Sequence, residues 1–373
     1  VKDIYFDDTG TGTKRWRTVL ISGVGAGGKG FFALDITDID NPKHLFAIQN
    51  DPSNREISHW DSSGAKNIYS YGSGSGSIPK NLNYSKLGET WSAPRIIRIK
   101  VNNKDKWVAV FGAGYNAAVN PDIGSAVYVL DIENEGKLIK DIDIEDQVNV
   151  MHNYVFGIPN GNTKTEFSMS QYGLSSYNVN CCKIRVSGAG DIKYTVTGTL
   201  NGDTMSNIKL NFETAPSNVI ITASKVNKTD IINSLPADLS VITANGTTKA
   251  NYDGALIYAS DLEGKITKIN LTGNFNLNSD NILTNVSSTT LFNAQSTSEN
   301  GRYIYTRPEV TINNDNNLWL YFGTGNTQKL HEQSNKIKNR LYGIKDTDFP
   351  QYSNISTPGD IGKCKTTPNC PQS

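Results

Sequence analysis

A repeated pattern of two short strands joined by a glycine-rich turn constrains the fold of this chain more than any other feature. The first strand of each unit is β-branched or aromatic, and the second closes on an apolar residue, often followed by Asp. Four copies occur, over residues 19–36, 107–133, 255–273 and 319–346. A further strand precedes three of them and carries a Pro near its start, where the lost amide is tolerated, over residues 90–99, 234–242 and 305–312.

A four-strand unit of roughly 40 to 50 residues that recurs along a chain is typical of a β-propeller blade. The glycine-rich turns suit hairpins that need positive φ. We therefore predict an all-β fold, a modified β-propeller. A β-sandwich with many hairpins is the alternative, and the recurring order of the elements favours the propeller. Residues 51–89 and 147–232 break the period, so we interpret them as a loop insertion and an inserted β subdomain within a single domain spanning 1–373.

The composition excludes several classes of protein. Among the 373 residues, 36 Lys and Arg offset 36 Asp and Glu, so the charge gives no footprint for nucleic acid or for an acidic membrane surface. Mean hydropathy is −0.43, and no apolar run is long enough to form a transmembrane helix. Glycine has no period of three, no heptad is sustained and aromatic residues make up 9%, which excludes collagen, coiled coil and wholesale disorder.

The start of the chain and its cysteines suggest an exported fragment. The chain begins at Val1 without an initiator Met or a leader, so we interpret it as a piece of a longer precursor. The cysteines form two local pairs, Cys181 with Cys182 and Cys364 with Cys370. We expect disulfides of an oxidising compartment, with the connectivity left open. Free thiols and zinc are the alternatives, and zinc is disfavoured because neither pair has C-x-x-C spacing or a His close by.

The repeated units also resemble a known family. The strongest stretch, residues 15–42, reads RWRTVLISGVGAGGKGFFALDITDIDNP. It is similar to the hallmark of the C-terminal domain of the PilC/PilY family of type IV pilus biogenesis factors and tip-associated adhesins. That hallmark is an aromatic-Arg-Thr strand, a Gly-rich turn and an "ALDVT" strand. Supporting stretches follow in the family's order, over residues 89–99, 108–116, 257–271 and 318–346.

The resemblance implies both a fold and a role. The fold is a modified β-propeller with quinoprotein-like blades, in a protein exported to the outer membrane, the cell surface or the pilus tip. The role is pilus biogenesis by opposing retraction, together with twitching motility, adherence to host cells and virulence. Major and minor pilins and a host-cell surface receptor are the implied partners. Because these are binding roles, we predict no enzymatic activity.

Calcium is the one cofactor that the resemblance implies. Relatives often carry a calcium loop of alternating Asp and Asn just before the strand that corresponds here to residues 256–258. The matching positions in this chain are Asn245, Thr247, Asn251 and Asp253. Calcium takes six to eight oxygen ligands, usually with several carboxylates, whereas this set holds a single carboxylate. We therefore expect a weak or altered calcium site, and a plain polar hairpin is the alternative.

Two other functions remain as alternatives. Quinone-dependent alcohol dehydrogenases are propellers that place a disulfide between adjacent cysteines beside the cofactor, so Cys181 and Cys182 invite a quinoprotein-type oxidoreductase. Those enzymes also carry a docking Trp after the "ALD" strand, but here Phe46 stands near that position. No nucleophile elbow, H-E-x-x-H or P-loop motif is present. The other alternative is a purely structural β domain of a larger adhesin.

Binding residues are expected in the insertions, because loops on a rigid β scaffold carry recognition. Within residues 168–179, Tyr172 and Tyr177 stand among Ser and Asn, a composition typical of recognition loops. We predict these two tyrosines as binding residues, and an inert decoration of the scaffold is the alternative.

Overall fold

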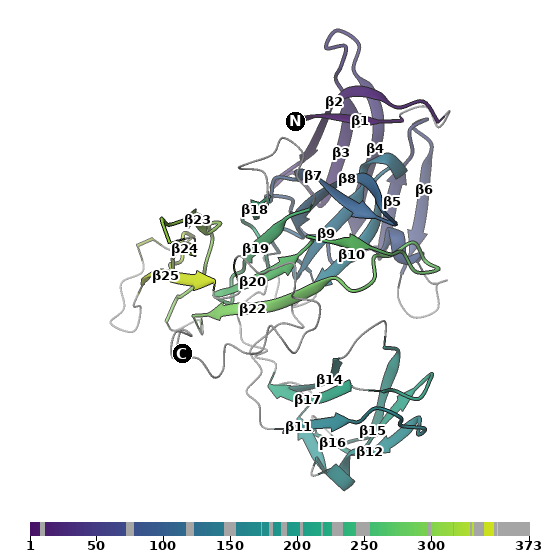
Figure 1. Cartoon of the computed structure of the whole chain (residues 1–373), viewed down its shortest axis with the longest axis vertical. Helices are drawn as coiled ribbons and strands as arrows, with labels where there is room; N and C mark the ends of the chain where they lie inside the picture. Colours follow the sequence, from purple (N-terminus) through teal and green to yellow (C-terminus); the bar gives the residue numbers. More distant parts are fainter. Residues whose placement is uncertain are drawn as a thin grey trace. The chain divides into compact units, whose positions relative to one another are not determined.

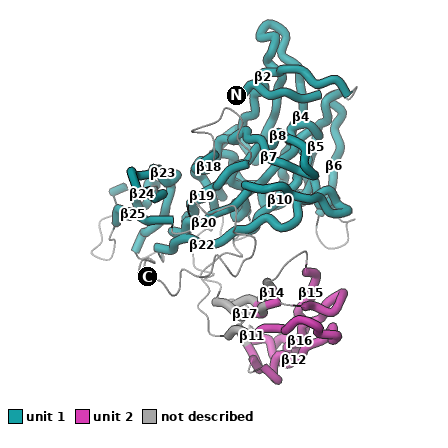
Figure 2. Tube along the Cα trace, viewed as in Figure 1, with its two compact units in different colours: residues 1–146, 230–354, 371–373 teal, residues 147–229, 355–370 magenta. Residues whose placement is uncertain are grey.

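The computed structural model of the protein contains two compact units (Figure 2). Unit 1 comprises residues 1–146, 230–354 and 371–373, and unit 2 comprises residues 147–229 and 355–370. The structure describes residues 1–7, 12–71, 78–116, 123–144, 154–172, 174–178, 182–187, 192–201, 204–217, 219–225, 234–243, 254–294, 296, 300–315, 317–328, 330–331, 339–346 and 349. Strands dominate the described part of both units, which confirms the all-β prediction. No helix in these residues is long and apolar enough to cross a membrane.

Sheet 1 of unit 1 is an antiparallel meander whose strands follow one another in chain order (Figure 1). Its strands are β1 (Lys2–Phe6), β2 (Arg15–Gly23), β3 (Gly30–Asp35), β4 (Lys43–Asp51), β5 (Glu56–Trp60) and β6 (Lys66–Ser70). The last two lie inside 51–89, where the sequence suggested a loop insertion. The structure differs there, because β5 and β6 extend the sheet.

The recurring units of the sequence form the other sheets of unit 1. Sheet 2 contains β7 (Arg95–Val101), β8 (Lys104–Gly112), β9 (Ala126–Asp131) and β10 (Lys137–Asp143), and the short β21 (Asn274–Phe275) pairs in parallel with β7. Sheet 3 contains β18 (Ser240–Ile242), β19 (Leu256–Ser260), β20 (Lys265–Asn270) and β22 (Ser287–Asn293). Sheet 4 contains β23 (Glu309–Ile312), β24 (Leu318–Gly323) and β25 (Leu341–Asp346). Among its described residues, unit 1 has two short 3₁₀ turns, η1 (Lys80–Leu82) and η2 (Ile132–Asn134).

A hydrophobic core fills the space between each pair of consecutive sheets. The first core joins sheets 1 and 2, the second joins sheets 2 and 3, and the third joins sheets 3 and 4. In β8, Ala109 and Phe111 belong to the first core, whereas Val108 and Val110 belong to the second. Sheets 2 and 3 are therefore covered on both faces, which explains their continuous apolar runs. Face-to-face stacking of this kind is typical of propeller blades.

The turn that follows β8 depends on a glycine. Gly114 has a φ of 91°, and a Cβ at this position would collide with the carbonyl oxygen of Glu89. The close approach lets the two segments exchange backbone hydrogen bonds: the amide of Glu89 donates to the carbonyl of Tyr115, and the amide of Tyr115 donates back to Glu89. The glycine-rich turn thus joins the end of β8 to the segment before β7.

Sheet 3 carries a fully buried lysine. The Nζ of Lys265 lies 3.2 Å from Oδ2 of Asp261, 3.3 Å from Oε2 of Glu263 and 3.2 Å from the carbonyl oxygen of Ile144. Burial lowers the pKa of Lys265, but the two carboxylates outweigh that effect and hold its pKa above the usual value. Burial has the opposite effect on a carboxyl group: it raises the pKa of Asp261, and the charge of Lys265 opposes that rise. The ammonium therefore links the turn between β19 and β20 to the chain just after β10.

Unit 2 has two sheets and a hydrophobic core of its own. One sheet contains β11 (Tyr154–Ile158), β14 (Cys182–Ser187) and β17 (Val219–Lys225), and the other contains β12 (Glu166–Ser168), β13 (Ser176–Asn178), β15 (Tyr194–Asn201) and β16 (Thr204–Phe212). A 3₁₀ turn, η4 (Met169–Tyr172), lies between β12 and β13. Fully buried side chains such as Leu210 and Ile221 form the centre of its core.

Candidate functional site

The β1–β2 and β7–β8 hairpins of unit 1 line an open groove of about 580 Å³. This volume lies within the range of roughly 300–1,000 Å³ that is usual for small-molecule sites. The groove combines aromatic side chains with charged ones, and it is lined by Tyr5, Lys14, Trp16, Arg98, Lys104, Asp105 and Trp107.

One wall of the groove is an exposed aromatic pair. Tyr5 of β1 and Trp16 of β2 lie directly opposite each other in the antiparallel register, and their ring centroids are 5.6 Å apart. Val19 and Ile21 of β2 are buried in the first core. Because side chains alternate between the faces of a strand, Trp16 lies on the other face of β2. Its exposed fraction is 65%, and that of Tyr5 is 46%.

The other wall is an aromatic–cation pair on sheet 2. Arg98 of β7 lies opposite Trp107 of β8, and the guanidinium carbon is 5.9 Å from the centre of the indole ring. Nη1 of Arg98 is 3.6 Å from Oδ2 of Asp105, whose Oδ1 is 3.3 Å from Nζ of Lys100. Cross-strand neighbours of this kind hold one another in position. The planar guanidinium is therefore fixed beside the ring.

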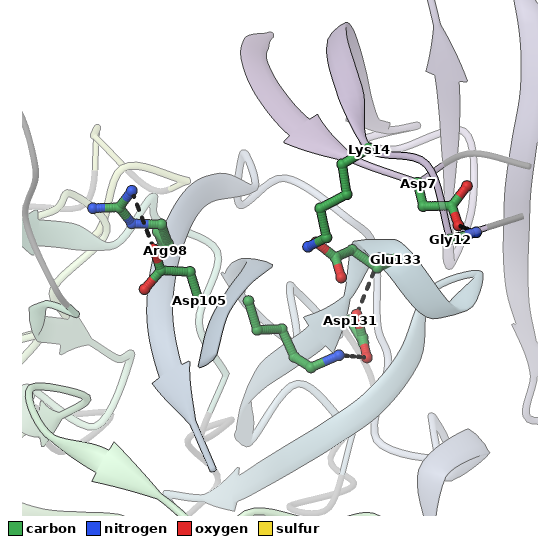
Figure 3. A network of polar contacts seen from close by, with 8 residues as sticks. Asp7, Gly12, Lys14, Arg98, Asp105, Asp131 and Glu133 are labelled. Carbon is green, nitrogen blue, oxygen red and sulfur yellow. Dashed lines mark hydrogen bonds and ion pairs between the residues drawn. The ribbon is translucent and has the colours of Figure 1, made fainter. Parts of the chain in front are cut away.

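Beside the groove, a chain of polar contacts links the β1–β2 hairpin to sheet 2 (Figure 3). Lys14, which directly precedes β2, points its Nζ toward Glu133 of η2, at 3.3 Å from Oε1. The amide of Glu133 donates to Oδ1 of Asp131 over 3.0 Å, and Oδ2 of Asp131 lies 2.7 Å from Nζ of Lys106. Burial raises the pKa of Glu133, and Lys14 and Lys106 oppose the rise. The network thus ties sheet 1 to the end of β9.

This arrangement suits binding. Three cationic side chains and one carboxylate line the groove beside three aromatic rings. No group of three or more His, Cys, Asp or Glu side chains that could hold a metal ion occurs among the residues that the structure describes.

The two tyrosines predicted as binding residues belong to unit 2, whereas the groove belongs to unit 1. Tyr172 ends η4, where its ring packs 6.4 Å from that of Phe167 against the core of unit 2. Tyr177 stands in β13, opposite Met205 of β16. The role predicted for them remains a prediction.

The predicted calcium and disulfide residues fall largely outside the described part of the chain. All four calcium positions lie there, namely Asn245, Thr247, Asn251 and Asp253. Cys181, Cys364 and Cys370 lie there too, and of Cys182 only the backbone, at the start of β14, is described. Both predictions therefore stay untested.

Sequence reasoning missed the groove, although one signal for it was present. In β2, an aromatic residue at position 16 is out of phase with the apolar residues at 19 and 21, so period-two alternation places a large ring in solvent. The second wall carried no such signal. Arg98 and Trp107 meet only through the register between β7 and β8.

The fold is thus an all-β one of stacked sheets, with an open groove of aromatic and charged side chains on the first two sheets. Residues 3–161 match the sequence profile of the PilY1 beta-propeller domain. Over these residues, which are less than half of its length, the chain is similar to PilY1 β-propeller domains, and this match confirms the resemblance and the propeller fold class inferred from the sequence. All seven groove residues lie within the matched range.

Relatives of known name match about two fifths of the chain. The type IV pilus biogenesis factor PilY1 of Pseudomonas aeruginosa (strain UCBPP-PA14) is 29% identical over 147 residues, which are 39% of this chain and 9% of that protein. A PilY1 homolog of Xylella fastidiosa is 27% identical over 151 residues, 40% of this chain and 7% of that protein. The matched segment is thus less than a tenth of each relative.

A solved structure matches over a longer range. The crystal structure of the Pseudomonas aeruginosa PilY1 C-terminal domain aligns with a TM-score of 0.45 and 18% sequence identity, covering 95% of this chain and 50% of that one.

Proposed function

We propose that this chain is a non-enzymatic β-propeller domain of a type IV pilus-associated adhesin that supports pilus biogenesis. The match of residues 3–161 to the PilY1 beta-propeller domain carries the proposal. The named relatives are type IV pilus biogenesis factors. In this role the domain contacts major and minor pilins at the cell surface or pilus tip, opposes retraction, and supports twitching motility and adherence to host cells.

Deletion of the chain's coding region in its own bacterium tests the pilus role. We expect few surface pili by electron microscopy and smaller twitching zones, both restored by the intact gene. Inactivation of the retraction motor in the deletion strain should bring pili back, because the domain opposes retraction. Normal piliation and twitching in the deletion strain would contradict the proposal.

Two measurements separate this function from its alternatives. Purified chain mixed with pyrroloquinoline quinone should show neither an absorbance shift nor alcohol oxidation, whereas a quinoprotein-type oxidoreductase shows both. Immobilised chain should retain isolated pilin complexes or host cells, whereas a purely structural β domain retains neither.

Calcium modulation of this function is a separate proposal. The donor set at Asn245, Thr247, Asn251 and Asp253 offers one carboxylate, which fits the needs of Ca²⁺ poorly. We therefore expect weak binding at most. Calorimetric titration of calcium into the chain and into Asp253→Ala tests the placement, which is wrong if the variant binds as the parent does.

A further inference from the structure

The groove exposes large flat rings that a protein surface ordinarily shields. Trp16 is 65% exposed and Tyr5 is 46% exposed, and the two rings are neighbours on one hairpin. Contiguous exposed apolar surface marks binding sites. Tyr and Trp in particular offer a rigid apolar face with a polar group at one end. The first requirement on a ligand is therefore a flat apolar face.

The second requirement on the ligand is negative charge. Lys14, Arg98 and Lys104 outnumber the carboxylates at the groove, even when Glu133, the partner of Lys14, is counted with Asp105, although the chain as a whole has zero net charge. Arg98 is held in place by Trp107 and Asp105, and a fixed guanidinium presents a planar fork that matches a carboxylate.

The third requirement is a set of hydrogen-bond donors on the ligand. Asp105 is the one acceptor-only side chain of the groove, and its side chain is 46% exposed. It suits a hydroxyl group of the ligand, and it disfavours a ligand that carries only negative charge. A pyranose ring with an attached carboxylate meets all three requirements, because it has a flat C–H face, hydroxyl groups and one negative charge.

We propose that this groove binds a glycan that carries carboxylate groups, such as a polymer of uronic acid. The exposed rings of Trp16 and Tyr5 stack against the sugar rings, while Trp107 positions the Arg98 guanidinium. Lys104 and Arg98 bind the carboxylates, and Asp105 accepts hydrogen bonds from hydroxyl groups. The inference gives the adhesion proposed above a ligand class, and it rests on that proposed function. Its test uses binding to the purified chain, which does not depend on pilus assembly.

The test is calorimetric titration of the full chain with oligogalacturonate at physiological salt. The methyl-esterified oligomer serves as the matched neutral ligand, and polyglutamate serves as a polyanion without sugar rings. We expect oligogalacturonate to bind at least tenfold more tightly than either. Equal binding of the methyl ester would overturn the role of charge, equal binding of polyglutamate would overturn the glycan class, and no binding of oligogalacturonate would overturn the site.

Variants locate the binding on the groove. Trp16→Ala should weaken oligogalacturonate binding at least tenfold, and Lys104→Ala should weaken it severalfold while leaving the methyl ester unaffected. Trp91→Ala is the control, because Trp91 is 53% exposed but does not line the groove; its binding should equal the parent's. Equal losses in Trp91→Ala and Trp16→Ala would overturn the assignment.

Piliation of the same variants separates this inference from the proposed function. A strain carrying Trp16→Ala should keep normal surface pili, whereas the deletion strain should lose them. Loss of pili in both strains, with oligogalacturonate binding by the purified variant intact, would overturn the glycan site and leave the pilus role standing.

Discussion

Replacement of the buried Lys265 by Met tests how much a buried charge cluster stabilises unit 1. The side chain is 0% exposed, and its ammonium lies 3.2 Å and 3.3 Å from carboxylate oxygens of Asp261 and Glu263, whose side chains are 1% and 10% exposed. Met fills a similar volume but leaves two buried carboxylates facing each other without the ammonium. Breaking a buried ion pair in this way costs about 3–5 kcal/mol, and we expect that loss of unfolding free energy at pH 8.

Urea unfolding followed by tryptophan fluorescence measures this loss. All five tryptophans lie in unit 1, at positions 16, 60, 91, 107 and 319, so the signal reports that unit. Lys80→Met is the matched control, because it removes an exposed ion pair, 2.9 Å from Asp280 with side chains 56% and 43% exposed. Such pairs are worth less than about 1 kcal/mol. A loss in Lys265→Met no larger than that in the control would refute the reasoning.

The pH dependence checks the electrostatic origin of the effect. Burial already raises the pKa of Asp261, and loss of the ammonium raises it further. As the pH falls, Asp261 takes up a proton and the repulsion with Glu263 disappears. The destabilisation should therefore be smaller at pH 5 than at pH 8. Adding Asp261→Asn and Glu263→Gln to Lys265→Met should recover part of the stability, and no recovery would point to packing instead.

Three further predictions concern the scaffold. Gly64→Ala and Gly114→Ala both place Ala at positive φ, 83° and 91°, but only the second Cβ collides with backbone. Thermal unfolding should show that Gly64→Ala loses about 1 kcal/mol of unfolding free energy and Gly114→Ala about 3 kcal/mol. Equal losses would contradict the collision. Burial raises the pKa of Tyr305 to about 12, so the absorbance titration of the parent should exceed that of Tyr305→Phe by one tyrosine ionisation near pH 12. Since the folded state holds that proton more tightly, stability should fall as the pH rises toward 12. Burial raises the pKa of Glu135, but hydrogen bonds from Ser62 outweigh it and lower the pKa overall. The stabilisation that these hydrogen bonds give the Glu135 carboxylate is present above the pKa of this residue in the unfolded chain, and it is lost as the pH falls. Ser62→Ala should therefore lower the unfolding free energy by about 0.5 kcal/mol at pH 7 and by nothing at pH 3. A loss that does not depend on pH would contradict this prediction.

The strands with the clearest sequence pattern could be predicted from their residue types. The β-branched and aromatic runs at 17–21, 107–111 and 318–322 lie within β2, β8 and β24. Pro94 and Pro308 directly precede β7 and β23. Proline has no amide hydrogen to donate to a neighbouring strand, so it is tolerated at this position.

One strand that the sequence did not predict, β5, buries polar side chains beside the core residue Ile57. In β5, Ser58 and His59 are buried polar residues, and Nε2 of His59 lies 2.7 Å from the carbonyl oxygen of Glu135. A pattern of apolar residues cannot reveal a strand of this kind. The same holds for the network at the groove, because Lys14 and Glu133 are brought together over 119 positions of sequence.

The sharing of cores between neighbouring sheets has a consequence for how this architecture can change in evolution. Sheets 2 and 3 contribute side chains from both faces to two different cores, so a polar substitution on either face of β8 or β19 removes apolar contacts from one of them. Sheets 1 and 4 each contribute to one core among the described residues. Their other faces do not pack against a second core among the described residues. Substitutions that leave stability unchanged should therefore accumulate mainly on those faces. Addition of a duplicated sheet at one end of the stack would preserve every existing core and create one more. We therefore expect this fold to be enlarged in evolution by whole blades.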